Sequence, residues 1–313
     1  TNRPTDWTDN NNGIGEGARI KLVTGGKHTK IAQPVLDAVN KLQSVPFIIS
    51  NHMVTASRLM LDNVSEYGID EELVRILHEI RKYKGETVFF PVTMDKRGRM
   101  YYRGGLLSPQ GTDFCKAAFQ FANSKPLGHN GFEAIAIHTA NVCGMDKISY
   151  NDRVSWVMAN IDSGTFASIT DFEDVINTFP NADTFQATVA ILEINRILAL
   201  DINPALVSSN LVCHQDGTCN GLQHMAALTG SRETAVSVNC VESTKDDVPS
   251  DIYGIIASEA ATMASGDVLD LINKYGRKMA KTPVMIVGYG AGKETVCKTV
   301  TLFLHTKCEN AKL

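Results

Sequence analysis

The stretch from residue 211 to residue 228 constrains the fold most, because three kinds of pattern follow one another within it. An apolar run at 211–213 leads into Asp216 and Gly217, and a helical pattern resumes at Leu222. A strand ending in this pair would bring the carboxylate to a sheet edge, where the glycine lets another group approach the backbone. A carboxylate beside a bare carbonyl suits a hard cation such as Mg²⁺. The same pair is also typical of a tight hairpin turn, so spacing alone leaves both interpretations open.

Length and composition indicate a globular protein with a sizeable core. The chain has 313 residues, of which 43% are apolar and 20% charged, as in ordinary soluble domains. No apolar run approaches 18 residues, so no membrane contact is expected. The seven cysteines form no CxxC pair, which favours a reduced intracellular protein. Cys213 and Cys219 do not combine with His214 and His224 into a known zinc spacing.

The net charge of −4 argues mildly against a dedicated nucleic-acid binder, but the basic residues are unevenly distributed. Residues 81–103 carry seven Lys and Arg against two acids, and residues 274–312 carry eight against two. A solvated charged face would explain either stretch by itself. Two such stretches favour contact with phosphate.

Hydrophobic periodicity predicts a mostly helical chain. Residues 1–34 form an N-terminal arm, which is Asn- and Gly-rich at its start, and helices are expected between 34 and 83. Residues 87–92 and 206–213 have the composition of strands, whereas 112–200 and 253–263 have helical spacing. A glycine-rich break at 288–292 separates the last two helices. We expect four regions, with bounds 1–34, 35–90, 91–230 and 231–313.

Four sequence blocks resemble, in order, the motifs of the single-subunit DNA-dependent RNA polymerases, the family of T7-like phage and mitochondrial enzymes. Residues 95–101 resemble the DxRGRxY element, and residues 121–141 the segment that follows it. Residues 214–228, HQDGTCNGLQHMAAL, resemble motif A, and residues 277–290 resemble motif B. The likeness covers roughly residues 35–297.

The resemblance implies an α/β right-hand polymerase fold, mostly helical with a small antiparallel palm sheet. Residues 91–230 would be a partial palm, and residues 231–313 shortened fingers. Two Mg²⁺ ions would be the cofactors, with Asp216 and the Gly217 carbonyl as metal ligands. Asp216, Lys281 and Tyr289 would be the catalytic residues. Arg277, Lys281 and Tyr289 would bind the substrate, and Tyr289 would help to choose ribonucleotides.

Arg277 and Lys281 are four residues apart, which places them on one face of a helix. Such like charges repel mildly without a ligand, so an anion site is favoured over an ordinary exposed pair. Pro283 departs from the family pattern, because it removes a helical hydrogen bond and disfavours helix at Thr282. We expect the helix to kink or to begin near Pro283, which leaves open whether it also carries Tyr289.

Arg97 and Arg99 flank Gly98, and two guanidiniums beside an approachable backbone suit contacts to nucleic acid. Tyr101 and Lys116 are further nucleic-acid-binding candidates carried over from the resemblance. The alternative is a surface hairpin with a charged tip.

Motif C of the family, a His-Asp pair that supplies the second metal carboxylate, does not occur in the 313 residues. We therefore expect a heterodimeric bacteriophage RNA polymerase in which a second subunit supplies motif C. DNA template, RNA product and ribonucleoside triphosphates would be further partners, together with a promoter-recruiting factor. The cytoplasm of a phage-infected bacterium is the expected location, with the mitochondrial matrix as the alternative. A fragment of a longer enzyme and an inactive nucleic-acid-binding subunit are the competing hypotheses.

Overall fold

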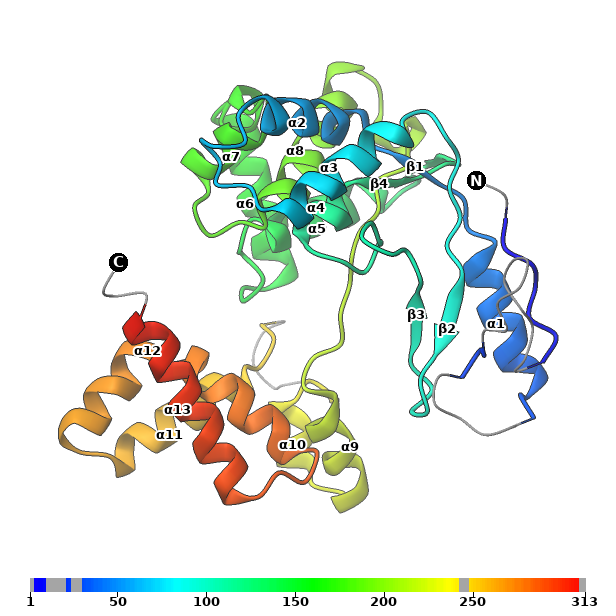
Figure 1. Cartoon of the computed structure of the whole chain (residues 1–313). Helices are drawn as coiled ribbons and strands as arrows, with labels where there is room; N and C mark the ends of the chain where they lie inside the picture. The colour runs from blue at the N-terminus through cyan, green and yellow to red at the C-terminus, as the bar shows by residue number, and fades with distance from the viewer. Residues whose placement is uncertain (1–2, 10–20, 24–29, 242–247, 310–313) are drawn as a thin grey trace. The chain divides into compact units, whose positions relative to one another are not determined.

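The computed structural model describes residues 3–9, 21–23, 30–241 and 248–309. Its contacts divide the chain into two compact units (Figure 1). The larger unit comprises residues 1–146 and 151–214, and the smaller unit comprises residues 147–150 and 215–313. Each unit is described by itself.

Helices dominate the larger unit, as the periodicity of residues 34–83 and 112–200 predicted. Acidic residues in the first turn and basic residues in the last complement the helix dipole of α3, whose N-cap Asp70 accepts a hydrogen bond from the Leu73 amide at 2.8 Å. The helices are α1 (Gln33–Gln43), α2 (Asn51–Asp62), α3 (Glu71–Lys82), α4 (Asp113–Ala117), α5 (Gly131–Val142), α6 (Tyr150–Asp162), α7 (Phe172–Thr178) and α8 (Thr184–Ala199).

Helix α8 lies at the centre of the larger unit and packs against α4, α5 and α7. Ala187, Ile191 and Ile194 are fully buried, in agreement with the continuous apolar pattern of this segment. Asp113 of α4 accepts hydrogen bonds from the amides of Phe185 and Gln186 at 2.8 and 3.1 Å. This contact satisfies donors that every helix leaves unpaired in its first turn.

The strands form three separate antiparallel pairs, which confirms the expectation of a mostly helical chain with small antiparallel sheets. The strand predicted at 87–92 instead begins at Val92, because Pro91 has no amide hydrogen to donate to a ladder. The pairs are β1 (Phe47–Ile49) with β4 (Phe119–Phe121), β2 (Val92–Met94) with β3 (Met100–Tyr102), and β5 (Lys125–Pro126) with β6 (Ser208–Ser209).

The strand predicted at 206–213 is largely absent. A 3₁₀ turn occupies Pro204–Leu206, β6 covers only Ser208–Ser209, and residues 210–217 have no regular structure. A strand exists only where a neighbour accepts and donates its backbone hydrogen bonds. Beyond β6 the Asn210 carbonyl still accepts a hydrogen bond from the Phe121 amide at 2.9 Å, but no ladder continues among the described residues, and Leu211 and Val212 instead pack against the buried clusters.

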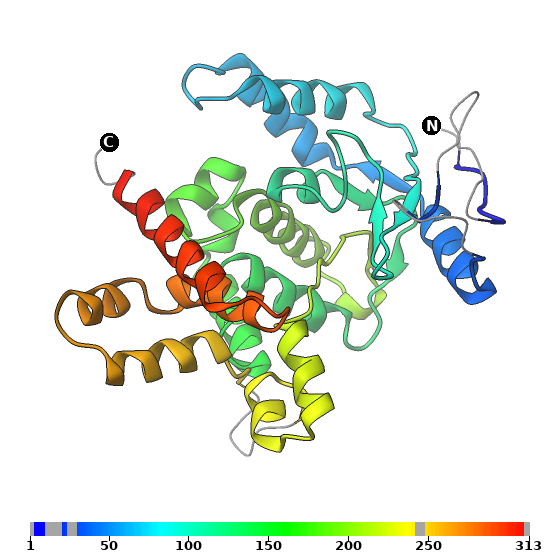
Figure 2. The ribbon, with the colours of Figure 1, turned by 60° about the horizontal axis from the view of Figure 1, so that its bottom comes forward.

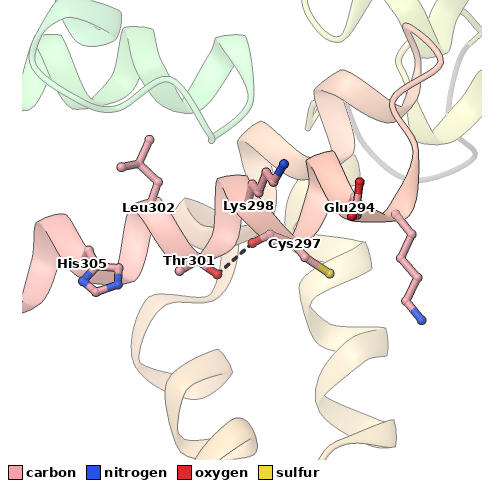
Figure 3. A pocket seen from close by; sticks show the side chains of 7 residues that line it. Glu294, Cys297, Lys298, Thr301, Leu302 and His305 are labelled. Atoms are coloured by element: carbon pink, nitrogen blue, oxygen red, sulfur yellow. Dashed lines mark hydrogen bonds between the residues drawn. The ribbon is translucent and has the colours of Figure 1, made fainter.

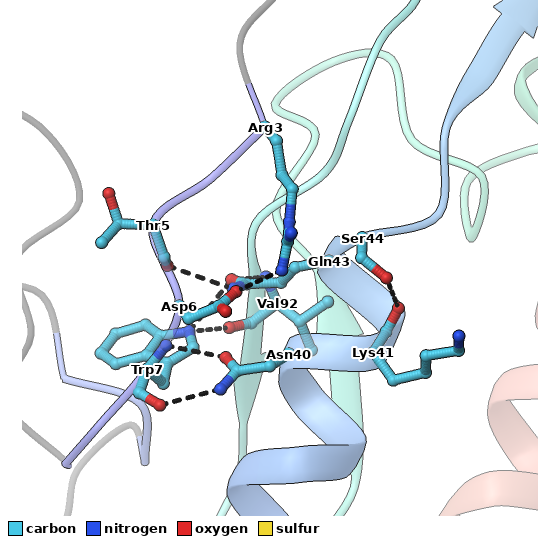
Figure 4. Close-up of polar contacts among 9 residues, drawn as sticks. All are labelled: Arg3, Thr5, Asp6, Trp7, Asn40, Lys41, Gln43, Ser44 and Val92. Atoms are coloured by element: carbon cyan, nitrogen blue, oxygen red, sulfur yellow. Dashed lines mark hydrogen bonds and ion pairs between the residues drawn. The ribbon is translucent and has the colours of Figure 1, made fainter.

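The described part of the N-terminal arm is anchored by Trp7, which is 1% exposed. Its indole N–H lies 3.0 Å from Gln43 Oε1 and 3.1 Å from the Val92 carbonyl (Figure 4). Its amide donates to Asn40 Oδ1, and the Asn40 side chain donates to the Trp7 carbonyl. Residues 3–9 are therefore extended but tightly bound to α1 and β2, together with the buried Leu22.

The smaller unit consists of helices. They are α9 (Asn220–Thr229), α10 (Arg232–Ser237), α11 (Ile252–Met263), α12 (Gly266–Val287) and α13 (Lys293–Glu309). The predictions of a helix at 253–263 and of a break at 288–292 are confirmed. Helix α11 packs against α12, and α12 against α13 (Figure 2). No helix in the described ranges combines the length and the apolar character needed to cross a membrane.

The smaller unit buries few apolar side chains. The three clusters of buried apolar residues found among the described residues all belong to the larger unit. Large apolar side chains of the smaller unit stay in solvent, with Leu228 86% exposed, Met263 77% and Leu302 68%.

Replacing Trp7 by Phe should destabilise the larger unit by about 1–3 kcal/mol, because the buried Val92 carbonyl and Gln43 lose a shared donor. The control is Trp156→Phe, since Trp156 is the only other tryptophan and makes ring contacts with Phe166 and Phe179. Chemical denaturation of both variants should show the larger loss for Trp7→Phe. Equal losses would mean that the indole hydrogen bonds contribute nothing.

Candidate functional site

Asp216 lies in the irregular segment just before α9 and is exposed to solvent. The chain then turns through Cys219, which has a left-handed backbone (φ 42°) and is the N-cap residue of α9. Gly217 leaves room for the side chain of Asn220, whose Oδ1 would lie 2.7 Å from a Cβ at position 217. Close approach thus explains this glycine, although the group that approaches it belongs to the same chain.

The fit of this segment to a metal ion is partial. Among the described residues no group of three or more His, Cys, Asp and Glu side chains is close enough together to hold a metal. Asp216 offers one carboxylate and Gly217 one carbonyl, whereas a two-metal site needs at least a second carboxylate. The described residues could supply one side of such a site and not the whole of it.

Helix α12 is kinked at Gly276, where the backbone leaves the helical region (φ 38°, ψ −118°). The prediction of a kink or a helix start near Pro283 is therefore wrong in position. Pro283 is buried within the helical segment that follows the kink. Arg277 and Lys281 lie together on that segment, one turn apart.

The guanidinium of Arg277 is held by the start of α11. Its Nε donates to Asp251 Oδ2 at 2.7 Å, and its Cζ lies 5.6 Å from the centre of the Tyr253 ring. The Arg277 side chain stays 37% exposed. Burial raises the pKa of Tyr253, and the phenol of Tyr253 stays protonated beside the guanidinium.

Tyr289 follows α12 directly, in a turn closed by its amide bonding to the Ile286 carbonyl at 3.0 Å, and its side chain is 59% exposed. Its neighbour Gly288 lies against Gly221 of α9, so close that a Cβ on Gly288 would come within 3.3 Å of the Gly221 carbonyl carbon. This backbone contact joins the end of motif B to the helix that follows Asp216.

The DxRGR element forms the tip of the β2–β3 hairpin, which is compatible with both interpretations of its arginines. Asp95 accepts hydrogen bonds from the Arg97 guanidinium at 2.7 Å, from the backbone amides of Arg97 and Arg99, and from the Tyr101 hydroxyl. Burial raises the pKa of Asp95, but these hydrogen bonds outweigh it and lower the pKa to about 2. Gly98 supplies the positive φ of 83° that the turn needs. Arg97 is therefore already paired within the hairpin.

Lys116 lies on α4, and its backbone hydrogen-bonds to the His214 side chain. Burial lowers the pKa of His214. Burial also lowers the pKa of His138, which lies beside His214, to about 4. The two imidazoles are therefore neutral at pH 7, and the buried Nε2 of His214 has no hydrogen-bond partner among the described residues.

The predicted site residues divide between the two units. Asp216, Gly217, Arg277, Lys281 and Tyr289 belong to the smaller unit, and Arg97, Arg99, Tyr101 and Lys116 to the larger unit. Sequence reasoning missed the roles of Asp251 and Tyr253 beside Arg277. It expected a helix at 253–263 and gave neither residue a role in the site.

The chain belongs to the DNA-dependent RNA polymerase family, whose family model matches residues 125–310. Within that family it is similar to the DNA-directed RNA polymerase of Pseudomonas phage phiKMV, with 33% identity over 70% of this chain and 28% of that enzyme. The mitochondrial DNA-directed RNA polymerase of Neurospora crassa is 33% identical over 67% of this chain and 15% of that enzyme. Mitochondrial DNA-directed RNA polymerase 1 of Arabidopsis thaliana is 29% identical over 76% and 27%, respectively. The chain thus spans less than a third of these relatives.

Replacing Gly276 by Ala should destabilise the smaller unit by about 1–3 kcal/mol, because a side chain is strained at a φ of 38°. Gly292→Ala is the control, since no atom lies within 4 Å of a Cβ at that position and its φ is not positive. Thermal unfolding of the two variants provides the comparison. If Gly276→Ala is as stable as the control, α12 can straighten without cost.

Proposed function

We propose that the chain forms the partial palm and shortened fingers of a DNA-directed RNA polymerase. The observation that carries the proposal is the gathering of Asp216, Arg277, Lys281 and Tyr289 in one unit of a family member. The reaction would be template-directed nucleotidyl transfer, with DNA as template, RNA as product and ribonucleoside triphosphates as substrates.

Two Mg²⁺ ions, when bound, would activate the RNA 3′-hydroxyl and neutralise the pyrophosphate that leaves. Asp216 and the Gly217 carbonyl would be ligands from this chain. Arg277 and Lys281 bring two fixed positive charges, one helical turn apart, to the triphosphate. Tyr289, exposed just beyond the same helical segment, would cover the base and ribose.

The second metal carboxylate must come from outside these 313 residues, and we propose that a second subunit carrying motif C supplies it. The sparse core of the smaller unit favours such a partner. On α13 the ring of Phe303 packs against Tyr275 and is not available to such a partner. Leu302 remains exposed on α13, beside Lys298 and His305 (Figure 3).

The β2–β3 hairpin would contact the template or the RNA–DNA hybrid through Arg99 and Tyr101, with Lys116 nearby in sequence. Arg97 would have to exchange Asp95 for a phosphate or act by shaping the hairpin. Relatives in phage and in mitochondria fit either proposed location, the cytoplasm of an infected bacterium or the mitochondrial matrix. A promoter-recruiting factor would complete the proposed assembly.

Asp216→Asn should lower RNA synthesis by the assembled enzyme by several orders of magnitude while DNA binding persists, because the metal loses a charged ligand. Asp270→Asn is the control, since it removes an exposed acid from α12 of the same unit. Single-turnover nucleotide addition and DNA-binding assays provide the two readouts. An Asp216→Asn enzyme that keeps a tenth of the wild-type rate would overturn the metal assignment.

If the chain were instead an inactive nucleic-acid-binding subunit, the wild-type assembly would show no metal-dependent RNA synthesis.

Tyr289→Phe should leave RNA synthesis largely intact but admit deoxynucleotides, since only the hydroxyl is lost. The ratio of kcat/KM for ATP to that for dATP measures the effect. Unchanged discrimination would remove Tyr289 from the ribose-selecting role.

The 313-residue chain by itself should be inactive with Mg²⁺, and addition of the protein that carries motif C should restore synthesis. Purification of the native enzyme followed by mass spectrometry of its polypeptides tests the split arrangement. A single longer polypeptide containing these residues would contradict the second-subunit proposal and leave the catalytic one in place.

A further inference from the structure

We infer that Asp251 is a positioning residue, which orients the guanidinium of Arg277 toward the triphosphate of an incoming nucleotide. The inference rests on the proposed function and assigns a role within it to a side chain outside motifs A and B. Asp251 precedes α11, is 26 residues from Arg277 in sequence, and reaches it with a charge-assisted hydrogen bond of 2.7 Å.

The atom through which Arg277 bonds is the first reason. Asp251 takes the Nε–H, which lies on the side edge of the guanidinium. Among the described residues, the two terminal Nη groups make no hydrogen bond. They carry four of the five guanidinium donors and form the fork that binds a phosphate through two parallel bonds. A carboxylate on Nε therefore fixes the plane of the group and leaves its phosphate-binding end available.

The second reason is that Asp251 does not cap α11, although it lies at the N-cap position of that helix. It is the N-cap residue of α11, yet its side chain caps no amide of that helix. Asp70 and Asp171, at the same position of α3 and α7, both accept amide hydrogen bonds there. An N-cap bond contributes about 1 kcal/mol, so a carboxylate turned away from it indicates a competing demand.

The surroundings of Asp251 are shaped for this orientation. A Cβ at Gly254 would lie 3.0 Å from Asp251 Oδ2, so glycine at that position clears the space that the carboxylate occupies. The ring of Tyr253, which is 8% exposed, lies under the guanidinium. The kink at Gly276 sets the direction of the backbone immediately before Arg277. Asp251, the ring of Tyr253 and the kink at Gly276 together restrict the orientation of the Arg277 side chain.

A purely structural tie between α11 and α12 is the competing explanation. The two side chains are 37% and 29% exposed, and ion pairs that reach solvent add little to stability. Helices α11 and α12 also pack extensively without this pair. Stability therefore gives a weak reason for the bond, whereas orientation of a phosphate ligand gives a strong one.

The test uses Asp251→Ala, Asp251→Asn and Arg277→Ala in the assembled enzyme. Asp251→Ala should raise the KM for ATP about tenfold and change kcat much less, because an untethered Arg277 must be ordered during binding. Asp251→Asn, whose amide oxygen can still accept from Nε, should retain most of the wild-type KM. In the Arg277→Ala background, Asp251→Ala should change KM by less than about twofold, since coupled residues are not additive. Asp270→Asn controls for the general loss of a negative charge.

Three outcomes would overturn the inference. A lower KM in Asp251→Ala would show that the carboxylate merely competes with phosphate for Arg277. Equal effects with and without Arg277 would show that the two residues act independently. A fall in melting temperature, with kcat and KM unchanged at a temperature where the variant is folded, would show a structural tie.

Equilibrium binding of Mg-ATP to the same assembled proteins separates this inference from the proposed function. A wild-type enzyme that binds Mg-ATP but makes no RNA would contradict the polymerase proposal, while the Asp251 variants would still test the orientation of Arg277 through their Kd. Weaker binding by Asp251→Ala, dependent on Arg277, would support the inference in that case too. A wild-type enzyme that neither binds nor polymerises would overturn both.

Discussion

Backbone hydrogen bonding decides which parts of this chain are well formed. Helix α8 satisfies its own peptide groups, obtains a cap for its first turn from Asp113, and can therefore be buried among α4, α5 and α7. Residues 211–217 join no ladder among the described residues, and they stay irregular. The larger unit is thus organised around an element that satisfies most of its own backbone hydrogen bonds and takes only the cap of its first turn from a neighbour. The segment that carries Asp216 needs one.

Sequence patterns predicted the helices well because their hydrogen bonds are local. The spacing of apolar residues predicted the helical region at 112–200, in which α5 and α8 lie. Sequence patterns failed where the structure depends on a pairing partner far away in the sequence or on the backbone angles of a single residue. Composition favoured a strand at 206–213 that requires a missing partner, and Pro283 suggested a kink that Gly276 makes instead. A proline can remain inside a helix, whereas the backbone angles found at Gly276 suit glycine alone.

The residues of the candidate site that belong to short sequence motifs could be predicted. The resemblance selected Arg277, Lys281 and Tyr289, which the structure brings onto or just after one helical segment. It gave no reason to join Asp251 to Arg277, because a contact across 26 residues leaves no periodic trace in one sequence. The hairpin around Asp95 could be predicted from the motif, because the hydrogen bonds that Asp95 accepts span six residues at most and follow from the spacing of the motif.

The contact between Gly221 and Gly288 limits how the chain can vary. Backbone meets backbone there, so the start of α9 and the end of α12 have no side chain between them that could absorb a change in size. A Cβ at position 288 would come within 3.3 Å of the Gly221 carbonyl carbon and would shift the start of α9 or the turn that holds Tyr289 by a few tenths of an ångström, whereas a Cβ at position 221 would make an ordinary contact at 3.5 Å. Directed evolution of nucleotide selectivity around Tyr289 should therefore vary position 288 together with position 221, because a side chain at 288 has to be accommodated by a small shift of the backbone at 221.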